Sequence, residues 1–105
     1  MKTYKVTVTP DALERLNRYL SYLLFVKKSE QAYDAVLEDY FKTIDNLSRM
    51  VGSIHESFKP ELKKRGLREI FFTEHDYVLL YWIDGDEAVV LYMFHTSEDY
   101  DNKLY

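Results

Sequence analysis

The sequence predicts an α+β domain in which a strand and a helical hairpin precede a three-stranded antiparallel meander, with the helices packed on one face of the sheet. The main observation is residues 67–105, where three runs of β-branched, aromatic and aliphatic residues are separated by short polar turns. Before them, apolar residues keep helical spacing between residues 10 and 51. Because 47% of the 105 residues are hydrophobic, enough for one compact core, we expect a single domain over residues 1–105.

The first predicted strand covers residues 4–9, where apolar and polar residues alternate. Thr9 and Pro10 then indicate the start of a helix, with Thr9 as its N-cap and Pro10 at the first helical position. We expect this helix to run to about Lys27. Its apolar stripe consists of leucines spaced three or four residues apart, namely Leu13, Leu16, Leu20, Leu23 and Leu24.

A second helix is expected to begin after its N-cap Ser29 and to stop at Gly52, so that the two helices form a hairpin. Its acidic residues predict a solvated face, although the same charges would also suit a basic partner. These acidic residues are Glu30, Asp34, Glu38, Asp39 and Asp45. Residues 53–66 predict a loop, with a short turn of helix near Pro60.

The meander is predicted at about residues 67–73, 77–83 and 88–95, with a hairpin signal at Asp84-Gly85-Asp86. Both faces of the second and third of these strands are apolar. One face must pack on the helices. The other face therefore needs a cover, which the C-terminal tail or another protein would supply.

Composition narrows the classes of function. The net charge of −4 argues against a generic electrostatic nucleic-acid binder, and the absence of cysteine excludes disulfides and a thiolate nucleophile. No metal or cofactor is expected, because His55-Glu56 lacks a second histidine at helical spacing and His75-Asp76 reads as a turn. The N-terminus has no signal-peptide pattern and no apolar run is long enough to span a bilayer, so we expect a cytoplasmic protein.

Four segments carry a resemblance to a known family. They are VTVTPDALERL, a strand leading into a helix; LREIFF, a strand with an arginine; DYVLLYWID, the central strand; and VVLYMFHTSEDY, a closing strand with a charged tail. Their order and spacing resemble the RelE/ParE superfamily of toxins from type II toxin–antitoxin (plasmid stabilisation) systems. The resemblance implies a cognate antitoxin as partner, and it covers nearly the whole chain.

The resemblance implies two modes of action. A RelE-like toxin is a metal-independent mRNA interferase acting at the ribosome, whereas a ParE-like toxin binds DNA gyrase and is not known as a nuclease. For an interferase, the catalytic candidates are Arg68, His95 and Tyr100. The candidates for binding a target or nucleic acid are basic, namely Lys59, Lys63, Lys64 and Arg65. The candidates for an antitoxin groove are Phe72, Leu80 and Trp82.

The chain departs from the nuclease pattern at two places. Val78 stands where the family's central strand commonly has arginine, and Glu98 and Asp99 follow His95 where the nuclease branch is basic. We expect these two carboxylates to repel an incoming phosphate. We therefore favour a ParE-like toxin that acts by binding, with an interferase or a non-toxic interaction module of the same fold as alternatives. Structural roles also remain open, because the basic residues fit a solvated loop, His95 a strand end and Tyr100 a tail anchor.

Overall fold

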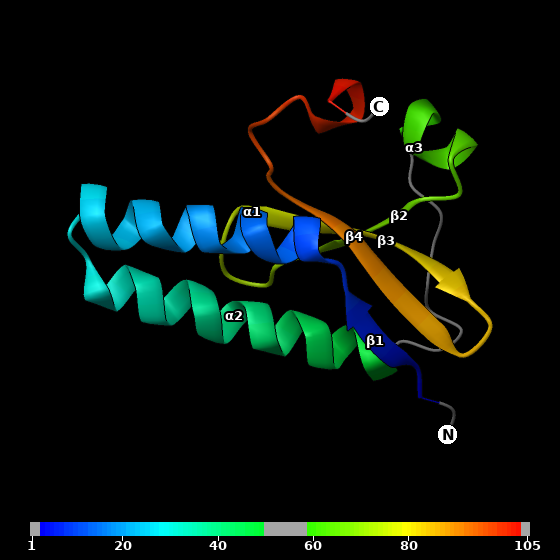
Figure 1. Cartoon of the computed structure of the whole chain (residues 1–105), viewed down its shortest axis with the longest axis horizontal. Coiled ribbons are helices and arrows are strands. Elements are labelled where there is room, and N and C mark those ends of the chain that lie inside the picture. Colours follow the sequence, from blue (N-terminus) through cyan, green and yellow to red (C-terminus); the bar gives the residue numbers. More distant parts are fainter. Residues whose placement is uncertain (1–2, 50–58, 104–105) are drawn as a thin grey trace.

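The computed structural model describes residues 3–49 and 59–103 and confirms the predicted α+β architecture. Figure 1 shows the hairpin of α1 and α2 lying along one side of a twisted sheet. The predicted stop at Gly52 lies outside the described residues. In chain order the elements are β1 (Lys5–Val8), α1 (Pro10–Ser21), the π-helical turn η1 (Tyr22–Val26), α2 (Glu30–Arg49), α3 (Pro60–Lys64), β2 (Arg68–Phe71), β3 (Tyr77–Asp84), β4 (Glu87–His95) and the 3₁₀ turn η2 (Tyr100–Asn102).

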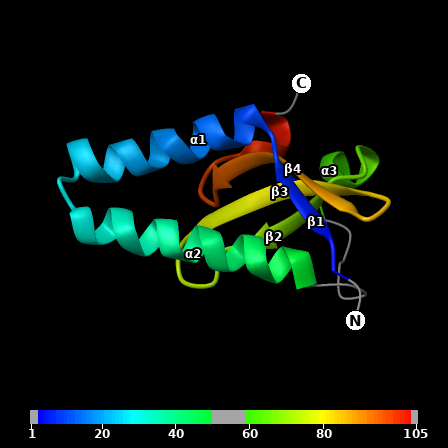
Figure 2. The ribbon, with the colours of Figure 1, turned by 60° about the horizontal axis from the view of Figure 1, so that its bottom comes forward.

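The four-stranded sheet has the order β1-β4-β3-β2. β2, β3 and β4 form the predicted antiparallel meander, whereas β1 pairs in parallel with β4 (Figure 2). The β3–β4 turn contains two residues between the paired Asp84 and Glu87. Its first residue, Gly85, has φ +60, a conformation that glycine adopts without strain and that closes a tight hairpin.

Local capping fixes where both long helices begin, as predicted. The Thr9 hydroxyl accepts the Ala12 N–H at 3.3 Å, and the Ser29 hydroxyl accepts the Ala32 N–H at 3.0 Å. α1 ends earlier than predicted as an α-helix, at Ser21. The π-helical turn η1 continues the helical path to Val26 and ends with a bond from the Lys27 N–H to the Tyr22 carbonyl, at 3.0 Å.

The main core lies between the helical hairpin and the sheet. Helix α1 contributes Ala12, Leu16 and Leu20, which recur every four residues and so share one face. Leu13 was expected in this stripe, but it is 43% exposed. The buried face of this helix therefore includes Ala12 in place of Leu13.

A β-bulge in β4 allows both faces of this strand to contribute to a core. Leu80 pairs with Tyr92 and Tyr81 pairs with Val90, so Leu91 is the extra residue. The bulge is anchored by the N-cap of α1, since the Thr9 hydroxyl donates to the Leu91 carbonyl at 3.1 Å. As a result, Leu91 and Tyr92 both pack against a second apolar cluster on the sheet face opposite the hairpin.

Candidate functional site

The sheet face opposite the hairpin has a cover from this chain itself. Its buried cluster consists of Leu62, Leu67, Val78, Leu80, Phe94 and Tyr100. The Tyr100 ring, in the tail, stacks on Phe94 with centroids 5.4 Å apart, and its hydroxyl donates to the Glu69 carboxylate. Lys59 Nζ lies 3.9 Å from the centroid of the Tyr100 ring. The tail and α3 thus provide part of the cover that the apolar strands require.

The cover leaves an open hollow on this face. It has a volume of about 320 Å³ and is lined by Arg65, Leu67, Trp82, Leu91 and Tyr92. Trp82 is 43% exposed, although the neighbouring strand residues Leu80 and Tyr81 are buried. Arg65 and Trp82 also line an adjoining hollow beside the β3–β4 turn. A large exposed indole beside aliphatic side chains and one guanidinium is typical of a surface that binds another protein.

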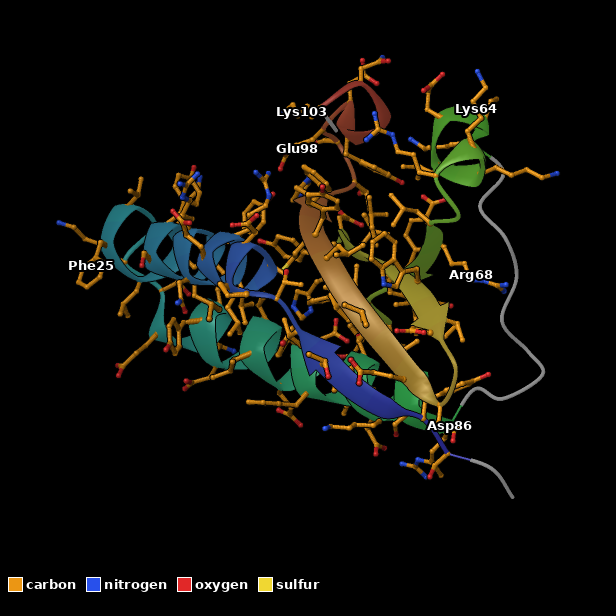
Figure 3. The ribbon with its side chains drawn as sticks, turned by 45° about the vertical axis from the view of Figure 1, so that its right-hand side comes forward. Phe25, Lys64, Arg68, Asp86, Glu98 and Lys103 are labelled. Atoms are coloured by element: carbon orange, nitrogen blue, oxygen red, sulfur yellow. The ribbon has the colours of Figure 1, made fainter. Side chains whose placement is uncertain are left out.

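A polar cluster ties the tail to α1, and Figure 3 labels its two tail members, Glu98 and Lys103. The Arg15 guanidinium donates to Tyr19 Oη at 2.9 Å and to Glu98 Oε2 at 3.0 Å, and the Tyr19 hydroxyl donates to the same carboxylate. Lys103 Nζ also donates to Glu98 Oε2, at 3.0 Å. The Arg15 guanidinium lies over the Phe94 ring, 4.2 Å from its centroid, so the cluster also borders the second apolar face.

The electrostatics of this cluster keep Glu98 ionised. Burial alone would raise the pKa of Glu98, but bonds from Tyr19, Lys103 and the His95 N–H, together with the charge of Arg15, lower it to about 2. Burial and the bond to Glu98 raise the pKa of Tyr19 to about 12. The carboxylate that was expected to repel an incoming phosphate is therefore held by two cations and a phenol.

The three interferase candidates do not converge. Arg68 is paired with Tyr81 on the sheet face that meets the helices, whereas Tyr100 packs on the opposite face. His95 is paired with Tyr77, four residues along β3 from Tyr81, which corresponds to about 13 Å along the strand. Ser97 engages His95 locally, since its N–H donates to Nδ1 at 3.1 Å.

The basic candidates gather around α3. Lys63 and Lys64 lie in its last turn, Arg65 caps its C-terminal end, and Lys59 precedes it. Lys64 Nζ lies 3.7 Å from Glu61 Oε1 with both side chains at least half exposed, so this pair adds little stability. Figure 3 shows Lys64 at the top of α3, pointing away from the sheet. These side chains form a basic surface beside the tail.

The three antitoxin-groove candidates lie at different depths. Phe72 is buried under α2, with its ring 6.3 Å from Tyr40 and 5.4 Å from Tyr77. Leu80 is fully buried on the opposite face of the sheet, and Trp82 stands exposed on that same face. Trp82 therefore offers the accessible contact surface, above a floor to which Leu80 contributes.

One buried carboxylate, that of Asp39, was not predicted from the sequence. Asp39 was assigned to the solvated face of α2, but it is 2% exposed. It accepts the backbone N–H groups of Thr73 at 3.2 Å and Glu74 at 2.9 Å, and Nδ1 of His75 lies 2.7 Å away. Burial raises the pKa of Asp39, but these bonds outweigh it and hold the pKa below its ordinary value.

The signal for this buried position is present in the sequence. Asp39 lies three residues after Val36 and four before Thr43, and both of these are buried. Its position on the apolar stripe therefore distinguishes it from the other acidic residues of α2. What the stripe does not reveal is the partner, because the β2–β3 turn lies 34–36 residues further along the chain.

The described residues contain neither a cluster of metal-ligating side chains nor a helix that could span a membrane. Within residues 3–49 and 59–103, no three side chains of His, Asp or Glu lie close enough to share a metal ion. Within the same ranges no helix combines the length and the apolar character that crossing a membrane requires.

Comparison with known proteins adds the family. A model described as the ParE toxin of type II toxin–antitoxin system, parDE, matches residues 6–100. The chain belongs to the ParE toxin family. No protein of curated function gives a significant sequence match.

Solved structures share the ParE-family fold. The chromosomal ParDE system from P. aeruginosa superposes with a TM-score of 0.68 at 14% identity, covering 89% of this chain and 96% of that chain. The toxin–antitoxin complex RelBE2 from Mycobacterium tuberculosis gives 0.55 at 26% identity, covering 89% and 98%. A conserved hypothetical protein from Helicobacter pylori gives 0.56 at 18% identity, covering 90% and 97%.

In this ParE-family chain Val78, which stands where the nuclease pattern commonly has arginine, has a structural role. Val78 is fully buried on the face covered by the tail, directly opposite Phe94 in the β3–β4 pairing. An arginine there would bring a charge into this apolar cluster and oppose the packing of Phe94 and Tyr100. The aliphatic side chain of Val78 is therefore compatible with the packing of the tail against this face.

Tyr100→Phe tests how the tail of this ParE-family protein is held. The variant keeps the ring that stacks on Phe94 but removes the hydroxyl that donates to Glu69. We expect the free energy of unfolding to fall by about 2 kcal/mol, as for one hydrogen bond to a charged group. Chemical denaturation measures this value, and Tyr92→Phe, on the same face, serves as the matched control. Equal stability of Tyr100→Phe and the wild type would contradict a role for the hydroxyl.

Proposed function

We propose that this protein is the toxin of a type II toxin–antitoxin pair, that it acts by binding a protein target such as DNA gyrase, and that a cognate antitoxin neutralises it. Family membership over residues 6–100 supports the toxin assignment. One of the similar solved structures is a toxin–antitoxin complex. The observation that carries the proposal is the open hollow at Trp82, because it offers an exposed indole among apolar side chains on a face that the tail and α3 cover only in part.

The chemistry of this hollow favours an antitoxin segment with apolar anchors and a nearby carboxylate. The side chains of Leu67, Trp82, Leu91 and Tyr92 would receive the apolar anchors. The guanidinium of Arg65, at the rim of the same hollow, would pair with the carboxylate. A segment of this kind would lie along the sheet face that the tail leaves open.

Action by binding is favoured over RNA cleavage by the placement of the polar groups. Cleavage would need a base, a proton donor and cations around one phosphate. Here Arg68 and Tyr100 lie on opposite faces of the sheet, and the Tyr100 hydroxyl donates a hydrogen bond to the Glu69 carboxylate. A mechanism that works through docking alone requires no such convergence.

The test is expression of the chain in bacteria, alone and together with a candidate antitoxin. This candidate, called the neighbour below, is the product of a small gene adjacent to that of the toxin. We expect growth arrest with the toxin alone, rescue with the neighbour, and inhibition of supercoiling by purified gyrase. Trp82→Ala should stay toxic but bind the neighbour at least tenfold more weakly, because it removes the central aromatic anchor.

The control is Phe41→Ala, which truncates an exposed aromatic residue on α2 that does not line the hollow. It should bind the neighbour like the wild type, in a measurement by calorimetry or fluorescence. Normal growth on expression of soluble wild-type toxin would contradict the toxin assignment. Unchanged affinity of Trp82→Ala for the neighbour would contradict only the assignment of the hollow as the antitoxin site.

An mRNA interferase is the second candidate, and one observation favours it. Basic side chains gather around α3 next to Tyr100, with Lys59 directly over its ring. Transcripts from the arrested cells separate the two candidates. Cleavage at defined codons, with gyrase unaffected, would favour the interferase. Intact transcripts with inhibited supercoiling would favour the binding mechanism.

A further inference from the structure

A second exposed apolar surface lies at the far end of the helical hairpin, where Figure 3 shows Phe25 pointing away from the sheet. We call this surface the hairpin tip and define it as Tyr22, Phe25, Val26, Lys27 and Lys28. Its apolar members are 48%, 71% and 63% exposed, for Tyr22, Phe25 and Val26 in turn. Three neighbouring side chains of this size rarely stay in water on a soluble domain unless they meet a partner.

A shallow hollow extends from the tip along the outer face of α1. It is lined by Glu14, Asn17, Arg18, Ser21, Tyr22, Phe25 and Val26, which recur every three or four residues. This face is separate from the hollow at Trp82, since the two share no lining residue. The molecule thus presents two apolar surfaces with different lining residues.

The surroundings of the tip are basic in an acidic protein. Between Glu14 and Glu30 the chain has four basic residues and no acidic residue, although its net charge is −4. Arg15 and Arg18 already contact Glu98 and Glu14. Lys27 and Lys28 flank the exposed rings, with Lys27 Nζ 5.8 Å from the centroid of Tyr22. A partner that matches this charge carries carboxylates around an apolar cleft.

The backbone holds the tip in one conformation. The π-helical turn carries Tyr22, Phe25 and Val26, and π-helical turns occur frequently at functional sites. Lys28 has φ 52, a left-handed conformation that is uncommon for a residue with a side chain. The Ser29 N–H bonds to the Leu23 carbonyl at 3.0 Å while its hydroxyl caps α2. A surface ordered in advance loses less entropy when it binds.

We propose that the hairpin tip is the surface with which this toxin engages its protein target, and that the target offers an apolar cleft bordered by carboxylates. The inference rests on the proposed function, because it assigns a target surface to the toxin. It assigns the target and the antitoxin to different faces of the molecule. A change at the tip should therefore weaken target binding without weakening antitoxin binding, whereas a general folding defect would weaken both.

The test compares two double variants that change the same residue types. Phe25→Ser/Lys27→Glu alters the tip, and Phe41→Ser/Lys42→Glu makes the same changes on the exposed part of α2. Each is expressed in bacteria at a measured level. Each purified protein is titrated into a gyrase supercoiling assay, and its affinity for the neighbour is measured separately. Circular dichroism and thermal denaturation verify that both variants fold.

For the tip variant we expect the protein level that gives half-maximal growth arrest to rise at least tenfold, with the affinity for the neighbour unchanged. The control variant should match the wild type in both. The conservative variant Lys27→Arg/Lys28→Arg should keep full toxicity, because it preserves the charge. The gyrase titration should show the same tenfold change if gyrase is the target.

The outcomes separate the inference from the proposed function. Arrest by the tip variant at the wild-type level would overturn the inference and leave the toxin assignment intact. Absence of arrest with the wild type would contradict the proposed function and the inference with it. Sedimentation of the wild type as a dimer that the tip variant breaks would assign the tip to a second copy of the chain and would also overturn the proposal.

Discussion

Replacing Asp39 by alanine is expected to lower the free energy of unfolding by about 3 kcal/mol, a large part of the stability of a domain of this size. The Asp39 carboxylate accepts the Thr73 and Glu74 N–H groups and contacts the His75 ring, so its loss leaves backbone donors in the β2–β3 turn without their acceptor. The midpoint of thermal unfolding should fall by roughly 15 °C.

Two further variants define the cause of this loss. Asp34→Ala removes an exposed carboxylate from the same helix and should change the unfolding free energy by less than about 0.5 kcal/mol. Asp39→Asn keeps one acceptor oxygen and should fall between the wild type and Asp39→Ala. Urea denaturation at neutral pH measures all three. A loss below about 1 kcal/mol for Asp39→Ala would show that the turn holds its position without α2.

Acidification is expected to destabilise the protein through Glu98. Because the pKa of Glu98 in the fold is about 2, below the usual value of 4.5, the folded state binds this proton less readily than the unfolded chain. The stabilisation is therefore fully present above pH 4.5 and is lost as the pH falls towards 2. The free energy of unfolding should decrease by up to about 3 kcal/mol over this window, with Asp39 adding a change of the same sign.

Glu98→Gln isolates this contribution. The variant should be less stable than the wild type at pH 7, and its stability should fall less steeply between pH 5 and pH 2. Glu14→Gln is the matched control, since Glu14 forms an exposed pair with Arg18 and its loss should leave the acid slope nearly unchanged. Denaturation curves at several pH values measure the slopes. Parallel slopes for Glu98→Gln and the wild type would contradict the assignment.

The elements that the sequence predicted correctly depend on local chemistry. Thr9 and Ser29 cap their helices through bonds that span three residues, and Gly85 closes its hairpin by its own backbone conformation. The meander was recognisable because its strands contain almost continuous apolar residues. Such features need no knowledge of which distant segments meet.

The features that the sequence did not reveal depend on tertiary contacts. The interferase candidates were chosen from the family resemblance and from the residue types that RNA cleavage needs, but Arg68 and Tyr100 lie on opposite faces of one sheet. Glu98 was interpreted as a charge that repels phosphate, whereas Arg15, 83 residues earlier, binds it. Neither the face of a strand residue nor a partner so far away follows from periodicity alone.

The parallel pairing of β1 with β4 also constrains how the chain folds during synthesis. The bond from Thr9 to Leu91 joins residues 82 positions apart, so β1 is able to pair with β4 only after most of the chain has left the ribosome. Until then the helical hairpin has only part of the apolar sheet on which it packs. Contacts of such long range slow folding, and a nascent chain of this protein completes its sheet only after translation has reached β4.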